Sequence, residues 1–214
     1  MIALTKSLYN QDISFILIVI SFFLISLIKG VYWKHAKLFF MGVFAQRYSN
    51  QYLREDNGFT ERVNLLTFLL MCINYTLIIA KFQNTKDLDT IVFLFFIVGL
   101  YFILKIIVIK LMSILFKVYD LNRVVVFFSL LFEKTLGFVL FPLVVVLYFF
   151  SFDISTEVLF VSFSLFAIIL SMKVFWLWKI GLTLFTLSRV YIFLYICLLE
   201  ICPLLLIGKR FFIK

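Results

Sequence analysis

Six long runs of apolar residues constrain the fold of this chain more than any other feature. Each run approaches or meets the roughly 17–25 residues that cross a hydrocarbon core about 30 Å thick as a helix. Helices are expected because an isolated strand in lipid leaves its backbone groups unpaired. The runs cover residues 13–28, 63–80, 91–112, 135–152, 157–172 and 190–207. The sequence therefore predicts an all-α integral membrane protein, in which residues 1–214 form a single membrane domain with a bundle of about six transmembrane helices.

The composition agrees with a membrane protein. Hydrophobic residues make up 65% of the chain and charged residues 14%, against about 45–50% and about 25% in soluble domains. The net charge of +9 is typical of the excess of Lys and Arg on the cytoplasmic side of membrane proteins. We therefore expect membrane lipids as partners, and no nucleic acid.

The distribution of basic residues predicts the orientation. Of the 20 Lys and Arg residues, 14 fall in the connections that share a side with residues 29–62, and 6 fall on the other side. This bias places the N-terminus outside and residues 29–62 inside. The basic residues at 209–214 would then lie outside, and a seventh crossing through residues 174–188 would bring them inside. Six and seven spans, and with them the side of the C-terminus, both stay open.

The inner connections are amphipathic. Residues 31–44 mix Trp33 and Phe44 with Lys34 and Lys37. A helix with apolar aromatic residues on one side and lysines on the other lies in the headgroup layer of a membrane. We expect interfacial helices of this kind on the inner side.

Polar residues inside the apolar runs are candidate functional residues. Glu200 lies in the last run, and Asn74 and Tyr75 lie in the second. An ionisable group at such a depth costs about 2.5–3.5 kcal/mol on insertion scales and is therefore a functional-site hypothesis. We predict a polar contact between Glu200 and Asn74, which serves either as a structural clamp or as part of an ion or proton site.

Four basic residues lie at the inner ends of the apolar runs. Lysine extends its amine toward the lipid headgroups when its stem is in hydrocarbon. We therefore predict interfacial anchoring or phospholipid contact for Lys105, Lys110, Lys134 and Arg189.

Residues 45–62, called the polar loop below, concentrate charge between the first two runs. One interpretation is a salt-bridged network of Arg54, Asp56, Glu61 and Arg62 that folds the loop and docks a partner. In the other, these arginines and Arg47 bind phosphate, because the guanidinium fork fits phosphate with two hydrogen bonds. Asn57-Gly58 predicts a turn within the loop.

Catalytic and metal-binding patterns are missing from the sequence. It has one histidine, and its three cysteines form no C-x-x-C pair. It also contains none of the short motifs of metalloproteases, serine hydrolases or P-loop nucleotide-binding proteins. We therefore expect no metal, no cofactor and no enzymatic activity.

Three stretches carry a resemblance to a known family: residues 46–56 with 60–66, residues 134–137 with 142–143, and residues 194–205. They resemble an uncharacterised family of small bacterial inner-membrane proteins, described only as a domain of unknown function. The family is typical of bacteria with gliding motility and type 9 secretion. This chain has Gly58 where the family loop often has proline. The resemblance implies a multi-pass protein of the bacterial inner membrane and no activity. With this location, the bias of basic residues predicts a periplasmic N-terminus.

The leading hypothesis is a non-enzymatic inner-membrane subunit that binds or stabilises other inner-membrane or envelope proteins, such as those of a secretion or motility machine. The first alternative is a transporter or lipid flippase that uses Glu200. The second is an enzyme acting on lipid headgroups with Asp56 and Glu61 as its carboxylates.

Overall fold

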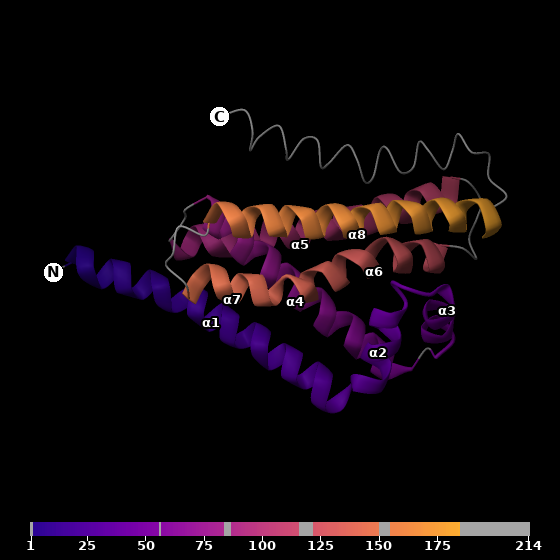
Figure 1. Cartoon of the computed structure of the whole chain (residues 1–214), viewed down its shortest axis with the longest axis horizontal. Helices are drawn as coiled ribbons and strands as arrows, with labels where there is room; N and C mark the ends of the chain where they lie inside the picture. The colour runs from indigo at the N-terminus through magenta and orange to yellow at the C-terminus, as the bar shows by residue number, and fades with distance from the viewer. Residues whose placement is uncertain (1, 56, 84–86, 116–121, 150–154, 185–214) are drawn as a thin grey trace. The chain divides into compact units, whose positions relative to one another are not determined.

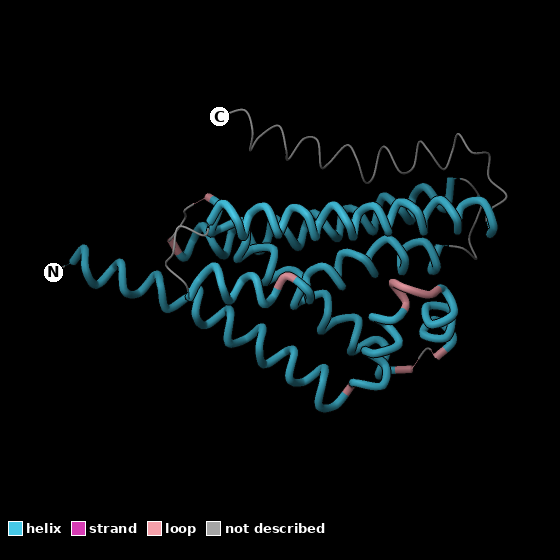
Figure 2. Tube along the Cα trace, viewed as in Figure 1, coloured by secondary structure: helices cyan, strands magenta, loops and turns pink. Residues whose placement is uncertain are grey.

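The computed structural model describes residues 2–55, 57–83, 87–115, 122–149 and 155–184. Within these ranges the chain is helical, with short turns between helices and no strand (Figures 1 and 2). The helices are α1 (Ile2–Val31), α2 (Trp33–Met41), α3 (Gln46–Arg54), α4 (Gly58–Phe82), α5 (Leu88–Leu115), α6 (Asn122–Val139), α7 (Phe141–Phe149) and α8 (Ser155–Leu184). The predicted all-α class is confirmed for the part of the chain that is described.

Four helical segments among the described residues are long and apolar enough to cross a membrane. They are Ile13–Val31, Gly58–Lys81, Leu88–Leu111 and Val126–Phe149. The first three overlap the predicted runs closely. The last predicted run, residues 190–207, lies outside the described residues together with Arg189 and Glu200.

The fourth segment differs from its prediction. It begins at Val126, whereas the charged pair Glu133-Lys134 predicted a start at residue 135. The pair does not end the apolar helix, because the side chain of Lys134 is 5% exposed and is covered by the protein. The helix is interrupted further on, between Val139 and Phe141, where Pro142 has no N–H to continue the ladder of backbone hydrogen bonds.

Helix α8 joins two regions that the sequence separates. The predicted run 157–172 and the first part of the connection from residue 174 form one helix that continues to Leu184. Lys173 marked the predicted end of the run, but its side chain is only 2% exposed. A buried lysine does not require the helix to leave the apolar environment at that point.

The described residues belong to two compact units. One contains Met1–Leu104 and Leu130–Phe166, and the other contains Lys105–Ser129 and Ala167–Lys214. In the second unit, the rings of Phe128 and Trp176 stack with centroids 6.5 Å apart, and the ammonium of Lys179 lies 5.5 Å from the Trp176 centroid. The candidate site lies in the first unit.

The first unit is organised around α4. Helix α1 runs antiparallel to it, since Ile28 shares an apolar cluster with Val63 near one end and Leu17 packs against a cluster that includes Ala80 near the other. Between these ends a larger apolar cluster joins α1, α4 and α7. Its buried members are Ile18, Leu24, Leu70, Ile73, Leu77 and Val144.

Helices α6 and α7 run parallel to α4. Going along α4, the residues Asn64, Asn74 and Leu77 bond in order to Lys134, Gly137 and Tyr148. Helix α5, which follows α4 in the sequence, runs antiparallel to it. Ala80 near the end of α4 shares a cluster with Ile91 near the start of α5, and Phe102 further along packs against Phe68 and Tyr75. Successive long helices of this unit therefore alternate in direction, as helices that cross a membrane one after another must.

Candidate functional site

Helices α2 and α3 form a tight hairpin, called the α2–α3 hairpin below (residues 33–54). The hydroxyl of Ser49 donates a hydrogen bond to the carbonyl of Gly42, 2.9 Å away. A Cβ atom at Gly42 would lie 2.5 Å from that hydroxyl oxygen, so the close approach requires glycine. The rings of Phe39 and Tyr52 pack edge to face, with centroids 5.5 Å apart. This buried aromatic contact holds the two helices together.

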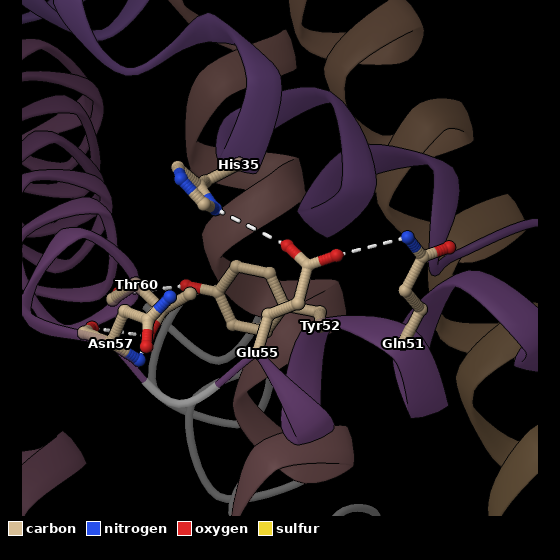
Figure 3. A network of polar contacts seen from close by, with 6 residues as sticks. All are labelled: His35, Gln51, Tyr52, Glu55, Asn57 and Thr60. Atoms are coloured by element: carbon tan, nitrogen blue, oxygen red, sulfur yellow. Dashed lines mark hydrogen bonds and ion pairs between the residues drawn. The ribbon is translucent and has the colours of Figure 1, made fainter.

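The hairpin is fastened to the start of α4. The phenolic hydroxyl of Tyr52 donates to the backbone carbonyl of Thr60 at 2.8 Å. The hydroxyl oxygen of Thr60 accepts a hydrogen bond from the N–H of Asn57 at 3.1 Å, as in one half of a capping box. Helix α4 begins at Gly58 directly after Asn57, so the dipeptide for which a turn was predicted instead forms the start of the helix, with Asn57 as an extended N-cap. Figure 3 shows these contacts beside one another.

The carboxylate of Glu55 points into the hairpin (Figure 3). One oxygen lies 3.5 Å from Nδ1 of His35, and the other accepts a hydrogen bond of 3.0 Å from the side-chain amide of Gln51. The imidazole of His35 stacks on the ring of Phe59, with centroids 5.8 Å apart and planes inclined by 3°. Glu55 therefore contributes to the packing of the hairpin, although its side chain stays partly exposed.

The arginines of the polar loop take no part in this packing. Arg47, Arg54 and Arg62 are exposed, as is Glu61, and none of the four forms an ion pair with another residue in the described ranges. Asp56 lies outside those ranges. Of the predicted network of Arg54, Asp56, Glu61 and Arg62, the ion pairs between Glu61 and the two arginines are not formed, and the pairs that involve Asp56 stay a prediction. Buried side-chain contacts to the backbone hold the described part of the loop.

The two helices of the hairpin expose faces of different chemistry. On α3 the exposed side chains of Arg47, Asn50, Gln51 and Arg54 recur at i, i+3, i+4 and i+7, which places them on one side of the helix. We call these four residues the α3 face. All four are polar, and two carry positive charge.

The exposed side of α2 combines apolar and basic side chains. Trp33, Lys34, Lys37 and Met41 are exposed, whereas Ala36 and Phe39 are fully buried on the opposite side. We call these four exposed residues the α2 face. Phe44, just beyond the helix, is 71% exposed and extends the apolar part of this surface.

A second group of polar contacts joins α4 to α6 inside the apolar segments, and we call it the α4–α6 seam. The side-chain amide of Asn74, which is fully buried, donates to the carbonyl of Gly137 at 2.8 Å. The hydroxyl of Tyr75 donates to the carbonyl of Glu133 at 3.3 Å. A Cβ atom at Gly137 would lie 2.7 Å from Cα of Met71, so only glycine allows the two backbones to come this close.

Lys134 is the charged member of the seam. Its ammonium donates to the backbone carbonyl of Asn64 at 3.2 Å and also to the side-chain oxygen of Asn64. The same ammonium lies 5.8 Å from the centroid of the Phe68 ring, within the range of a cation–π interaction. Lys134 therefore binds protein groups and does not extend freely toward lipid headgroups.

The other candidate residues from the sequence belong neither to the hairpin nor to the described contacts of the seam. The side chain of Lys105 is 5% exposed, and that of Lys110 is exposed. Glu200 and Arg189 lie outside the described residues, so the predicted contact between Glu200 and Asn74 stays a prediction. Within the described ranges, no group of three His, Cys, Asp or Glu side chains is placed to hold a metal ion.

Several residues that build the site gave no signal in the sequence. Ser49 and Tyr52 each donate one hydrogen bond to a backbone carbonyl, and no spacing rule predicts such a bond. Asn64 bonds to a residue 70 positions away. The only sequence signals of this contact are an Asn at the start of one apolar segment and a Lys within a later one.

Comparison with protein-family models gives a match to a domain of unknown function, DUF4271, over residues 14–211. The chain belongs to the DUF4271 family. No curated protein and no solved structure matches it significantly. The DUF4271 match includes the α2–α3 hairpin, the polar loop and the α4–α6 seam. The match confirms the predicted membership of an uncharacterised family, and it assigns no activity to the chain.

Proposed function

We propose that this chain is a non-enzymatic subunit of the bacterial inner membrane that docks an envelope protein, of a secretion or motility machine, through the α2–α3 hairpin. One observation carries the proposal. The hairpin is folded by Ser49, Tyr52 and Glu55, which leaves Arg47, Arg54 and Arg62 exposed and without ion pairs among the described residues. Exposed cationic side chains that the fold does not use are suited to binding a partner.

The proposed arrangement in the membrane has six spans. The four apolar segments are joined by residues 157–172 and 190–207, with the N-terminus in the periplasm and the hairpin in the cytoplasm. The parallel course of α4 and α6–α7 supports alternating crossings. The α2 face, with exposed Trp33 beside Lys34 and Lys37, supports a position of α2 in the headgroup layer.

The carboxylates of this region favour docking over catalysis. Glu55 is held by His35 and Gln51, and Glu61 is exposed and makes no contact with another described side chain. Asp56, the other carboxylate of the enzyme alternative, lies outside the described residues. The use of Glu55 in the packing of the hairpin supports a binding role for the loop in preference to chemistry on a lipid headgroup.

The test compares the partners recovered with two charge-matched variants of the full chain, extracted from native membranes in mild detergent. Arg47→Gln with Arg54→Gln alters the α3 face, whereas Lys29→Gln with Lys110→Gln removes the same charge at exposed positions elsewhere. We expect the wild type and the control to recover a defined protein in constant ratio to the tagged chain, and the arginine variant to lose most of it. Recovery of the tagged chain alone in every sample would refute the docking function.

A transporter is the second candidate, and the side chain of Asn74 favours it. Its amide nitrogen is bonded to Gly137, but its carbonyl oxygen is buried and accepts no hydrogen bond from a described residue. Such an oxygen inside a membrane segment is suited to an ion or a proton donor. A Glu200→Gln variant with full function in cells would argue against transport through this layer.

A further inference from the structure

We infer that the protein docked by the hairpin presents an acidic segment to the α3 face, with two carboxylates about 10 Å apart. This inference rests on the proposed docking function and names the chemistry of its partner. Arg47 and Arg54 are seven residues apart on one helix, and at 1.5 Å per residue their positions are separated by about 10 Å along its axis.

The α3 face matches carboxylates in shape and in charge. Each guanidinium presents a planar fork of N–H donors that fits a carboxylate with two parallel hydrogen bonds. Asn50 and Gln51 lie between the two arginines in the sequence of the helix, and the exposed side-chain amide of Asn50 is suited to the backbone or side chains of a bound segment. None of the four residues of the α3 face is acidic, and Glu55, which follows the helix, accepts a hydrogen bond from Gln51 and lies 3.5 Å from His35.

The contrast between the two faces of the hairpin selects protein over lipid as the occupant. A surface that lies in the headgroup layer combines basic residues with large apolar ones, and the α2 face does so through Trp33 and Met41. The α3 face contains no apolar side chain. Tyr48 flanks it at 37% exposure, and Tyr beside Arg is the composition enriched at protein–protein hot spots.

The α3 face is also held in place before binding. The Ser49–Gly42 and Tyr52–Thr60 hydrogen bonds fix the buried side of the helix, so less backbone freedom is lost when a partner binds. The matching segment is a helix with acidic residues at i and i+7, which lie on one face about 10 Å apart.

The first experiment locates the carboxylates chemically in native membranes. Arg47→Lys and Arg54→Lys keep the charge and introduce amines, which a carbodiimide joins directly to nearby carboxylates. Mass spectrometry of the linked peptides is expected to connect both positions to Asp or Glu residues of one partner protein. Lys37 on the α2 face is the internal control, and it is expected to give no link to that partner.

The outcomes separate the inference from the function on which it rests. If the variants still recover the partner but both positions link only to carboxylates of this chain, or to none, docking stands and the acidic segment is refuted. If no partner is recovered by the wild type, the docking function itself fails.

A charge-reversal variant covers the case in which lysine weakens binding. Arg47→Glu with Arg54→Glu is expected to lower partner recovery at least tenfold further than the glutamine pair, because it adds repulsion to the loss of attraction. Recovery equal to that of the glutamine pair would contradict an acidic partner surface.

A last measurement tests lipid as the occupant. In nanodiscs, the wild type and the glutamine pair are expected to retain phosphatidylglycerol equally over phosphatidylcholine, as measured by native mass spectrometry. Loss of phosphatidylglycerol in the glutamine pair, with partner recovery unchanged, would assign the α3 face to lipid and overturn the inference.

Discussion

The α2–α3 hairpin and the α4–α6 seam use polar side chains in opposite ways. In the hairpin, the bonds join residues close in sequence, such as Ser49 to Gly42 and Tyr52 to Thr60, which are 7 and 8 positions apart. In the seam, Asn74 reaches Gly137 and Lys134 reaches Asn64, across 63 and 70 positions. The hydrogen bonds of the hairpin are therefore local, although Phe40 of the hairpin also packs against Phe138 of α6. The bonds of the seam exist only when the long helices have assembled.

The difference in range implies a difference in role. A polar group buried in hydrocarbon must be bonded within the protein, so the seam contacts stabilise the assembled bundle. The hairpin buries only its fastening groups and leaves its cations in solvent. Stability should therefore depend mainly on the seam, and binding mainly on the hairpin.

The largest effect is expected for Gly137→Ala. The new Cβ would lie 2.7 Å from a backbone atom of Met71, and no side-chain rotation relieves such a clash, so α4 and α6 must separate and weaken the Asn74 hydrogen bond. We expect a loss of about 3 kcal/mol or more in the free energy of unfolding in detergent. Gly99→Ala is the matched control, because a Cβ there meets nothing within 4 Å. Equal effects at the two glycines would contradict a close α4–α6 contact.

The next prediction compares the loss of stability on removing each partner of the contact between Lys134 and Asn64. Asn64→Ala leaves the buried ammonium of Lys134 without its side-chain acceptor and is expected to cost about 1–3 kcal/mol. Lys134→Met is expected to cost less, because Asn64 is exposed and water can replace the lost donor. Equilibrium unfolding of both variants measures the order. A larger loss for Lys134→Met would show that the ammonium contributes net stability.

A smaller and local effect is expected for Tyr52→Phe. The substitution removes only the hydroxyl that bonds to Thr60, at a cost of about 1 kcal/mol. Hydrogen exchange is expected to rise in α3 and at the start of α4, while the thermal unfolding of the long helices stays unchanged. Tyr48→Phe, at an exposed neighbouring position, should leave exchange as in the wild type. Faster exchange throughout α4 would contradict the local character of the hairpin.

The sequence predicted what depends on runs of residues and missed what depends on single contacts. Length and hydropathy were sufficient for the first three long helices, although α4 begins at Gly58, ahead of the predicted run from residue 63. Charge was misleading at Lys134 and Lys173, which marked predicted span ends but are buried inside continuous helices. The reason is physical: a lysine ends a membrane helix only when no protein group covers it, and the covering residues are distant in sequence.

The polar loop shows the same limit. Its composition indicated a binding or folding element, and nearby opposite charges favoured a salt-bridged network. The described part of the loop is held by uncharged side chains, and the bonds of Ser49 and Tyr52 to backbone carbonyls leave no pattern in the sequence. That the arginines form no ion pair among the described residues became visible only in three dimensions.

The most direct test of the account measures stability and partner recovery on the same preparation of Arg47→Gln with Arg54→Gln. Because both side chains are exposed and unpaired among the described residues, the free energy of unfolding is expected to stay within about 0.5 kcal/mol of the wild type. Recovery of the partner from native membranes is expected to fall at least tenfold. A variant that recovers the partner as well as the wild type, or that loses it only together with its fold, would contradict the claim that these arginines serve binding.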